Sequence, residues 1–125
     1  MGTIVRAEIS QKNKYWIDKH RHYELKHFCL QYPDWKKAHS DLHSTVIPLS
    51  ITKRVAARAM YSKNIEMIEK AAREADPYLY DYIMKGVTEG KSYTYMKTVL
   101  GIPCGKDMYY DRYRKFFWLL SESRK

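Results

Sequence analysis

Between Ser50 and Ala75 the chain places an apolar or small side chain at every third or fourth position. This spacing forms one stripe along a helix of several turns, and Ser50 is a favourable N-cap for that helix. Such a stripe must be covered by the core of a helical domain or by a second copy of the chain in a homodimer. Its members are Ile51, Val55, Ala59, Ser62, Ile65, Ile68 and Ala72.

Prolines, glycines and polar caps divide the remaining sequence into shorter helical segments. Pro33 and Pro77 can open a helix but cannot lie inside one, whereas Gly90 and Gly101 are typical of helix ends. No segment alternates between apolar and polar residues with period two, so we predict an all-α protein. The expected helices cover residues 14–32, 33–43, 50–75, 77–90, 92–100 and 106–121, with an extended loop at 44–49.

The chain is long enough for one domain, or for a small domain with a helical extension. We expect a flexible arm at residues 1–13 and an N-terminal helical region at residues 14–75 that holds the candidate dimer stripe. Residues 76–125 are expected to form a separate C-terminal domain.

Positive charge concentrates in that C-terminal part. The formal net charge is +9, from 23 Lys and Arg against 14 Asp and Glu. From Lys91 onward there are eight basic and three acidic side chains. A surplus of this size is typical of proteins that bind a polyanion. Its overlap with two adjacent helices and the short turn Gly101–Gly105 predicts a helix-turn-helix that binds double-stranded DNA.

The last helix has two faces when its residues are placed 100° apart. The face expected to enter the core carries Tyr109, Tyr113, Phe116 and Leu120, and the opposite face carries Asp107, Tyr110, Asp111, Arg114 and Trp118. The predicted DNA-binding residues are Lys91, Lys97, Lys106, Asp107, Tyr110, Arg114 and Lys115.

The basic residues have different expected roles. Arg114 is expected to bind a guanine edge through two hydrogen bonds, which contributes about 1–3 kcal/mol of discrimination. Lys106 and Lys115 are expected to bind phosphates, which gives affinity without sequence information. Lys91 and Lys97 are expected to hold the DNA backbone from the preceding helix.

The acidic residues of the last helix would repel phosphate. Asp107 and Asp111 therefore accept a hydrogen bond from a cytosine amino group or, as we favour, pair with Arg114 and Lys115 within the helix. Trp118 lies one turn too far along to reach a groove, and we expect it to cover another helix or subunit.

Other chemistries lack the residue patterns that they require. His20, His22, His27 and Cys29 lie close in sequence, and His39 and His43 are four residues apart, but no Cys-x-x-Cys or His-Glu-x-x-His motif accompanies them. Cys104 lies near a helix start that would stabilise a thiolate, but no base is near it in sequence. We therefore expect no metal site, no cofactor and no enzymatic activity. The absence of a signal peptide and of a spanning apolar segment predicts a cytoplasmic protein with no membrane partner.

The run from Tyr78 to Leu120, especially VTEGKSYTYMKTVLGIPCGKDMYYDRYRKFFWLL, resembles the RinA/ArpU-like regulators of bacteriophages and prophages of Gram-positive bacteria. The matching features are Tyr93, the turn Gly101-Ile102-Pro103 and the segment Tyr109–Phe117. The N-terminal segment ELKHFCLQYPDWKK is similar to leaders of such proteins. The resemblance implies a C-terminal module like the fourth region of sigma factors. It also implies activation of late phage genes by binding promoter DNA near RNA polymerase.

The sequence thus predicts a transcriptional regulator of phage or prophage late genes. One alternative is a small terminase-type subunit for DNA packaging, which also joins a helix-turn-helix to an oligomerising helix. Another is a phage-encoded inhibitor that binds a host enzyme.

Overall fold

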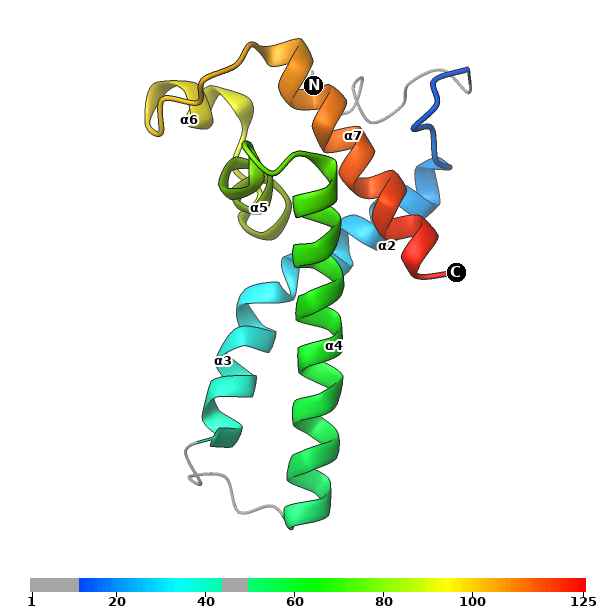
Figure 1. The fold of residues 1–125 in the computed structure, drawn as a ribbon, viewed down its shortest axis with the longest axis vertical. Coiled ribbons are helices and arrows are strands. Elements are labelled where there is room, and N and C mark those ends of the chain that lie inside the picture. The colour runs from blue at the N-terminus through cyan, green and yellow to red at the C-terminus, as the bar shows by residue number, and fades with distance from the viewer. Residues whose placement is uncertain (1–11, 44–49) are drawn as a thin grey trace.

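The computed structural model describes residues 12–43 and 50–125, and these ranges contain six helices and no strand (Figure 1). The all-α prediction is confirmed for this part of the chain. The helices are α2 (Lys19–Leu30), α3 (Tyr32–His43), α4 (Ile51–Ala75), α5 (Tyr80–Glu89), α6 (Tyr93–Thr98) and α7 (Lys106–Ser123). Residues 1–11 of the expected arm, the expected loop at 44–49 and the side chain of His43 lie outside the described residues.

The long helix α4 belongs to two regions of the molecule (Figure 1). α3 packs along the N-terminal half of α4. We call α3 together with residues 51–64 of α4 the stalk. α2, α5, α6 and α7 gather around the C-terminal half of α4, and we call this part the head.

One hydrophobic core fills the head and joins helices from both ends of the chain. Ile68 and Ala72 of α4, Leu25 of α2, Ile83 of α5 and Phe116 of α7 are all buried in it. α7 packs mainly on α4 and also contacts α2 and α5. The boundary expected at residue 76 therefore does not separate two cores.

Two helices begin later than expected because polar side chains bind the backbone before them. The Asp18 carboxylate accepts a hydrogen bond from the His20 N–H, so α2 begins at Lys19 and not at residue 14. The Asp76 carboxylate accepts hydrogen bonds from the N–H groups of Tyr78 and Leu79. These bonds close a turn over residues 76–79, and α5 begins only at Tyr80.

The expected N-cap of α4 and the expected end of α5 at Gly90 are confirmed, whereas the N-cap of α5 is Leu79. The Ser50 hydroxyl accepts a hydrogen bond from the Lys53 N–H at the start of α4. Gly90 ends α5 in the left-handed conformation, with φ of 70°, which a side chain would disfavour. No helix in residues 12–43 and 50–125 combines the length and the apolar composition needed to cross a membrane.

Candidate nucleic-acid interface

The turn between α6 and α7 is anchored at both sides. Ser92 caps α6 by accepting a hydrogen bond from the Tyr95 N–H. Gly101 has a φ of 66°, and the following residue, Ile102, is buried and donates its N–H to the Met96 carbonyl at 3.0 Å. The Tyr93 hydroxyl donates to the Cys104 carbonyl at 2.7 Å. These bonds hold the turn at a fixed position before α7 begins at Lys106.

The face of α7 expected to enter the core is buried except at Tyr113, which is half-buried. Tyr109, Phe116 and Leu120 are almost fully buried, and Phe117 joins them. Gly86 of α5 allows the Tyr109 ring to approach, since a Cβ built at Gly86 would lie 2.2 Å from the Tyr109 hydroxyl oxygen. The close packing of α7 against α5 therefore requires glycine at position 86.

The polar face of α7 is expected to expose Tyr110, but this prediction is wrong. Only 7% of Tyr110 is exposed. It lines a cavity of about 90 Å³ together with Lys26 of α2 and Lys91 of the α5–α6 link. The helical wheel assumed that α7 packs on one side, whereas α4, α2 and α5 all contact the helix. Tyr110 is therefore not available to enter a DNA groove.

Two further residues of the polar face are partly covered. Arg114 is half-buried, and its buried Nε has no hydrogen-bond partner within the described structure. The Trp118 ring lies 6.0 Å from the ring of Tyr15, so the segment before α2 lies against this part of α7. Trp118 thus packs against another part of the chain, in agreement with the sequence prediction.

The pairing predicted for Asp111 is also wrong. Its carboxylate pairs with its neighbour Arg112, and the Arg112 Nε lies 3.1 Å from a carboxylate oxygen of Asp76. Arg112 therefore connects α7 to the turn that precedes α5. The wheel could not reveal this interaction because Asp76 is 36 residues away in the sequence.

The remaining lysines of the predicted set are accessible to different degrees. Lys97 of α6 and Lys106 at the first position of α7 are exposed, whereas Lys91 and Lys115 are half-exposed. The Lys91 ammonium lies 4.8 Å from the centre of the Tyr95 ring. Lys97 and Lys106 thus place cations on either side of the anchored turn.

Beyond Lys106, the solvent-facing side of α7 carries more acidic than basic side chains. Asp107 and Glu122 are exposed and Asp111 is half-exposed, against the half-exposed Arg114 and Lys115 on the same side. Carboxylates repel phosphate, so a duplex lying along the whole of α7 would meet unfavourable charge. The fully exposed lysines of the predicted set, Lys97 and Lys106, lie on α6 and at the start of α7.

A contact that the sequence does not reveal fixes the other end of α7. The Arg21 guanidinium of α2 donates hydrogen bonds to the Ser121 hydroxyl and to the Ser121 and Arg124 carbonyl oxygens. The Arg124 guanidinium in turn lies 3.7 Å from the centre of the Phe28 ring. These contacts join residues about a hundred positions apart in sequence, and no local pattern marks them.

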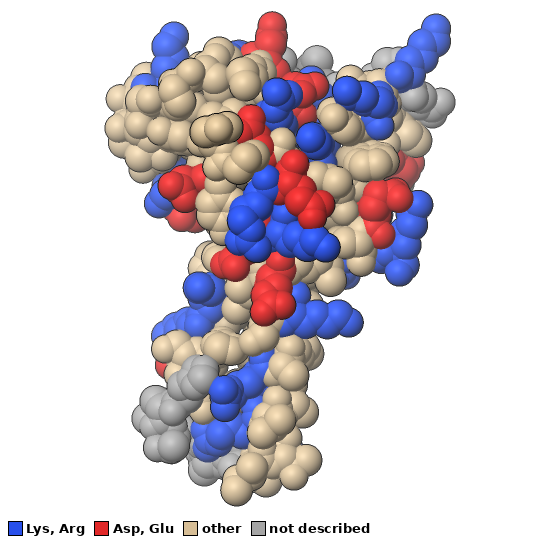
Figure 2. Space-filling view, viewed as in Figure 1, with Lys and Arg blue, Asp and Glu red and all other residues tan. Residues whose placement is uncertain are grey.

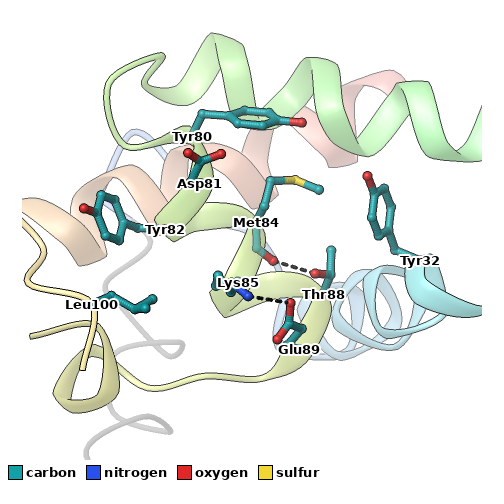
Figure 3. Close-up of a pocket in the computed structure, with 9 residues that line it drawn as sticks. All are labelled: Tyr32, Tyr80, Asp81, Tyr82, Met84, Lys85, Thr88, Glu89 and Leu100. Atoms are coloured by element: carbon teal, nitrogen blue, oxygen red, sulfur yellow. Dashed lines mark hydrogen bonds and ion pairs between the residues drawn. The ribbon is translucent and has the colours of Figure 1, made fainter. Parts of the chain in front are cut away.

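A second cavity, an open groove of about 480 Å³, lies along α5 (Figure 3). Figure 3 shows the rings of Tyr32, Tyr80 and Tyr82 around Met84, with the Lys85–Glu89 ion pair at one edge. No local pattern in the sequence predicts this groove. The ionic residues of the lining are Asp81, Lys85 and Glu89. The acidic surplus makes this groove unsuitable for a polyanion.

The histidines and cysteines do not form a metal site in the described part of the chain, where no three His, Cys, Asp or Glu side chains converge. Burial raises the pKa of the Cys104 thiol and the Asp76 carboxylate raises it further, so the thiolate expected near the start of α7 is disfavoured. His22 is buried against Phe117, with ring centres 4.8 Å apart. Burial, helped by the Lys26 charge, lowers the pKa of His22 to about 4.

Comparison of the chain with protein-family models, with curated proteins and with solved structures finds no match in any of the three.

Proposed function

We propose that the protein binds double-stranded DNA through α6, the anchored turn and the start of α7, and that it regulates transcription. The observation that carries the proposal is the pair of exposed cations, Lys97 and Lys106, on either side of that turn. Gly105 at the N-cap adds no side chain in front of α7, and the positive end of the helix dipole faces the same region.

The proposed lysine contacts are those expected from the sequence, whereas the roles of Arg114 and Tyr110 differ. Lys97 and Lys106 bind phosphates, and Lys91 supports them from the α5–α6 link. Asp107 lies at the first turn of α7, within reach of a base edge. Arg114 reaches DNA only through its partly exposed guanidinium. Tyr110 stays in the core and makes no contact.

The most specific part of the proposal is that the protein regulates phage or prophage late genes, with host RNA polymerase as a second partner. It rests on the resemblance of residues 78–120 to the RinA/ArpU-like regulators. Binding near a promoter would place the protein beside the polymerase.

The test is selection of bound duplexes from a random library, followed by affinity measurements over a range of salt concentrations. Lys97→Ala and Lys106→Ala should each weaken binding to all sequences. Each should also reduce the slope of log K against log salt by about 1, because one phosphate contact is lost. Tyr110→Phe and Lys125→Ala are the matched controls, and neither should change affinity. If no duplex binds at low salt, the proposal fails.

Light scattering distinguishes the regulator from the packaging alternative. A ring-forming species that binds DNA without sequence preference would favour a terminase-type subunit. A monomer or dimer that selects one short sequence would support the regulator.

A further inference from the structure

The N-terminal half of α4 leaves an apolar surface uncovered on the stalk. Ile51 is 81% exposed, Val55 is 57% exposed and Met60 is 52% exposed. Two small residues beside them, Ala56 and Ala59, are also exposed. At 100° per residue these five side chains share roughly half of the helix circumference. We call them the open arc.

α3 packs along the Ile51 edge of the open arc, and the five side chains of the arc stay exposed. The Arg54 guanidinium donates a hydrogen bond to the Leu42 carbonyl, and the Ser62 hydroxyl lies 2.9 Å from a ring nitrogen of His39. Tyr32 at the start of α3 donates a hydrogen bond to the Glu69 carboxylate. These contacts place α3 along one side of α4.

Cationic side chains border the open arc. Lys53 and Arg58 lie at its two edges on the helical wheel, and Lys63 lies one turn beyond Ala59. None of these three forms an ion pair within the described residues. No Asp or Glu occurs from Ile51 to Ile65. Figure 2 shows the same division: Lys and Arg gather on the stalk beside uncharged residues, whereas most Asp and Glu lie over the head and its junction with the stalk.

We infer that the open arc is a docking site for an acidic amphipathic helix of a partner protein. Such a helix would cover the apolar side chains and place its carboxylates against Lys53, Arg58 and Lys63, forming a three-helix bundle with α3 and α4. A second copy of the chain fits less well, because pairing two open arcs would bring the cations of both copies together. Duplex DNA would leave the apolar side chains without a partner. The stalk also projects away from the end of the head that carries α6 and the start of α7 (Figure 1).

The test uses the full chain and a fluorescently labelled synthetic peptide of about twenty residues, long enough for a stable helix on binding. The peptide carries Leu at the a and d positions of a heptad repeat and mainly Glu elsewhere. It should bind with a gain in helical circular dichroism and with an affinity that falls as salt is raised. Val55→Asp and the double variant Lys53→Glu/Lys63→Glu should each weaken binding by at least about tenfold.

The matched controls place the same changes elsewhere. Val99→Asp alters an equally exposed valine between α6 and α7, and Lys70→Glu/Lys125→Glu alters two lysines outside the stalk surface. Both controls should bind the peptide as the unmodified chain does. The stalk variants should retain the thermal midpoint and the duplex affinity of the unmodified chain. If Lys106→Ala loses duplex binding but still binds the peptide, the result bears on the proposed function and not on the open arc.

Several results would overturn the inference. The inference fails if the peptide does not bind or if Val55→Asp binds the peptide as tightly as the unmodified chain does. It also fails if a scrambled peptide of the same composition binds as tightly as the designed peptide. A dimer that Val55→Asp dissociates would identify a second copy as the occupant. Binding of vesicles that contain anionic lipid, lost in Val55→Asp, would identify a membrane surface. Loss of duplex binding in Lys53→Glu/Lys63→Glu would identify DNA.

Discussion

The two halves of α4 follow the same apolar spacing but have opposite surroundings. In the head, Ile65, Ile68 and Ala72 are buried beneath other helices. In the stalk, Ile51 and Val55 continue the stripe but face solvent. A regular stripe therefore predicts a helix but does not determine which of its turns are covered. Coverage depends on helices that come from elsewhere in the chain.

Charge follows the same division. In the head, Arg112 pairs with Asp76 and Asp111, and Lys85 pairs with Glu89. In the stalk, Lys53 and Lys63 form no ion pair within the described residues. These head residues pair with one another, whereas the stalk leaves Lys53, Lys63 and the apolar side chains of the open arc available to a partner.

The largest predicted contrast is between two apolar truncations in α4. Ile68→Ala should reduce the free energy of unfolding by about 3–4 kcal/mol, because it leaves a cavity in the core. Val55→Ala should change it by less than about 0.5 kcal/mol, because this side chain is exposed. Urea unfolding followed by circular dichroism measures both. A large cost for Val55→Ala would mean that the open arc is covered in solution.

The next contrast concerns glycine at a close contact in the head. Gly86→Ala should cost about 2 kcal/mol, because its Cβ would meet the Tyr109 hydroxyl. Gly105→Ala, where nothing lies near the new Cβ, is the matched control and should be close to neutral. Adding Tyr109→Phe should recover most of the loss, since it removes the clashing oxygen. Additive effects in this double-mutant cycle would contradict the packing described here.

Acid should weaken the head through His22. Its pKa is lowered to about 4 in the folded chain, from an ordinary value of 6.5 in the unfolded chain. The unfolded chain therefore binds the proton first, and stability is lost as the pH falls from about 6.5 towards 4. Between pH 7 and pH 5 this amounts to about 1.5–2 kcal/mol. His22→Phe should flatten this part of the stability–pH curve, and an unchanged curve would refute the assignment.

The smallest contrast compares single charges in the two regions. Asp76→Asn should cost about 1 kcal/mol, since the carboxylate binds Arg112 and two backbone N–H groups. Lys53→Gln in the stalk should leave the thermal midpoint unchanged, because this side chain forms no ion pair within residues 12–43 and 50–125. Differential scanning calorimetry measures both variants. A lower thermal midpoint for Lys53→Gln would show that the Lys53 side chain stabilises the stalk and would contradict this prediction.

Local patterns predicted several elements because their causes lie within a few residues. Ser50 and Ser92 cap the helices that follow them, and Gly90 and Gly101 end the helices before them. The aromatic face of α7 was also predictable, since Tyr109 and its partners recur at helical spacing. Asp18 and Asp76 were harder to interpret, because each could act as a cap or could close a turn.

The candidate site depended more on distant parts of the chain. Arg112 pairs with Asp76, 36 residues away, and Arg21 holds the end of α7 from a distance of about a hundred residues in sequence. A helical wheel contains neither interaction. It also counts Tyr110 as exposed, although α7 has neighbours on more than one side.

The order of residues was enough to predict that the described chain is helical, where most of its helices begin and end, and how its charges are distributed. Periodicity, capping and backbone conformation act over one or two turns, so they can be seen in the order of residues. Packing between distant helices was needed to show that Tyr110 is buried, that Lys97 and Lys106 remain exposed and that the N-terminal part of the α4 stripe is uncovered. Burial depends on which helices meet in space, and those helices are far apart along the chain.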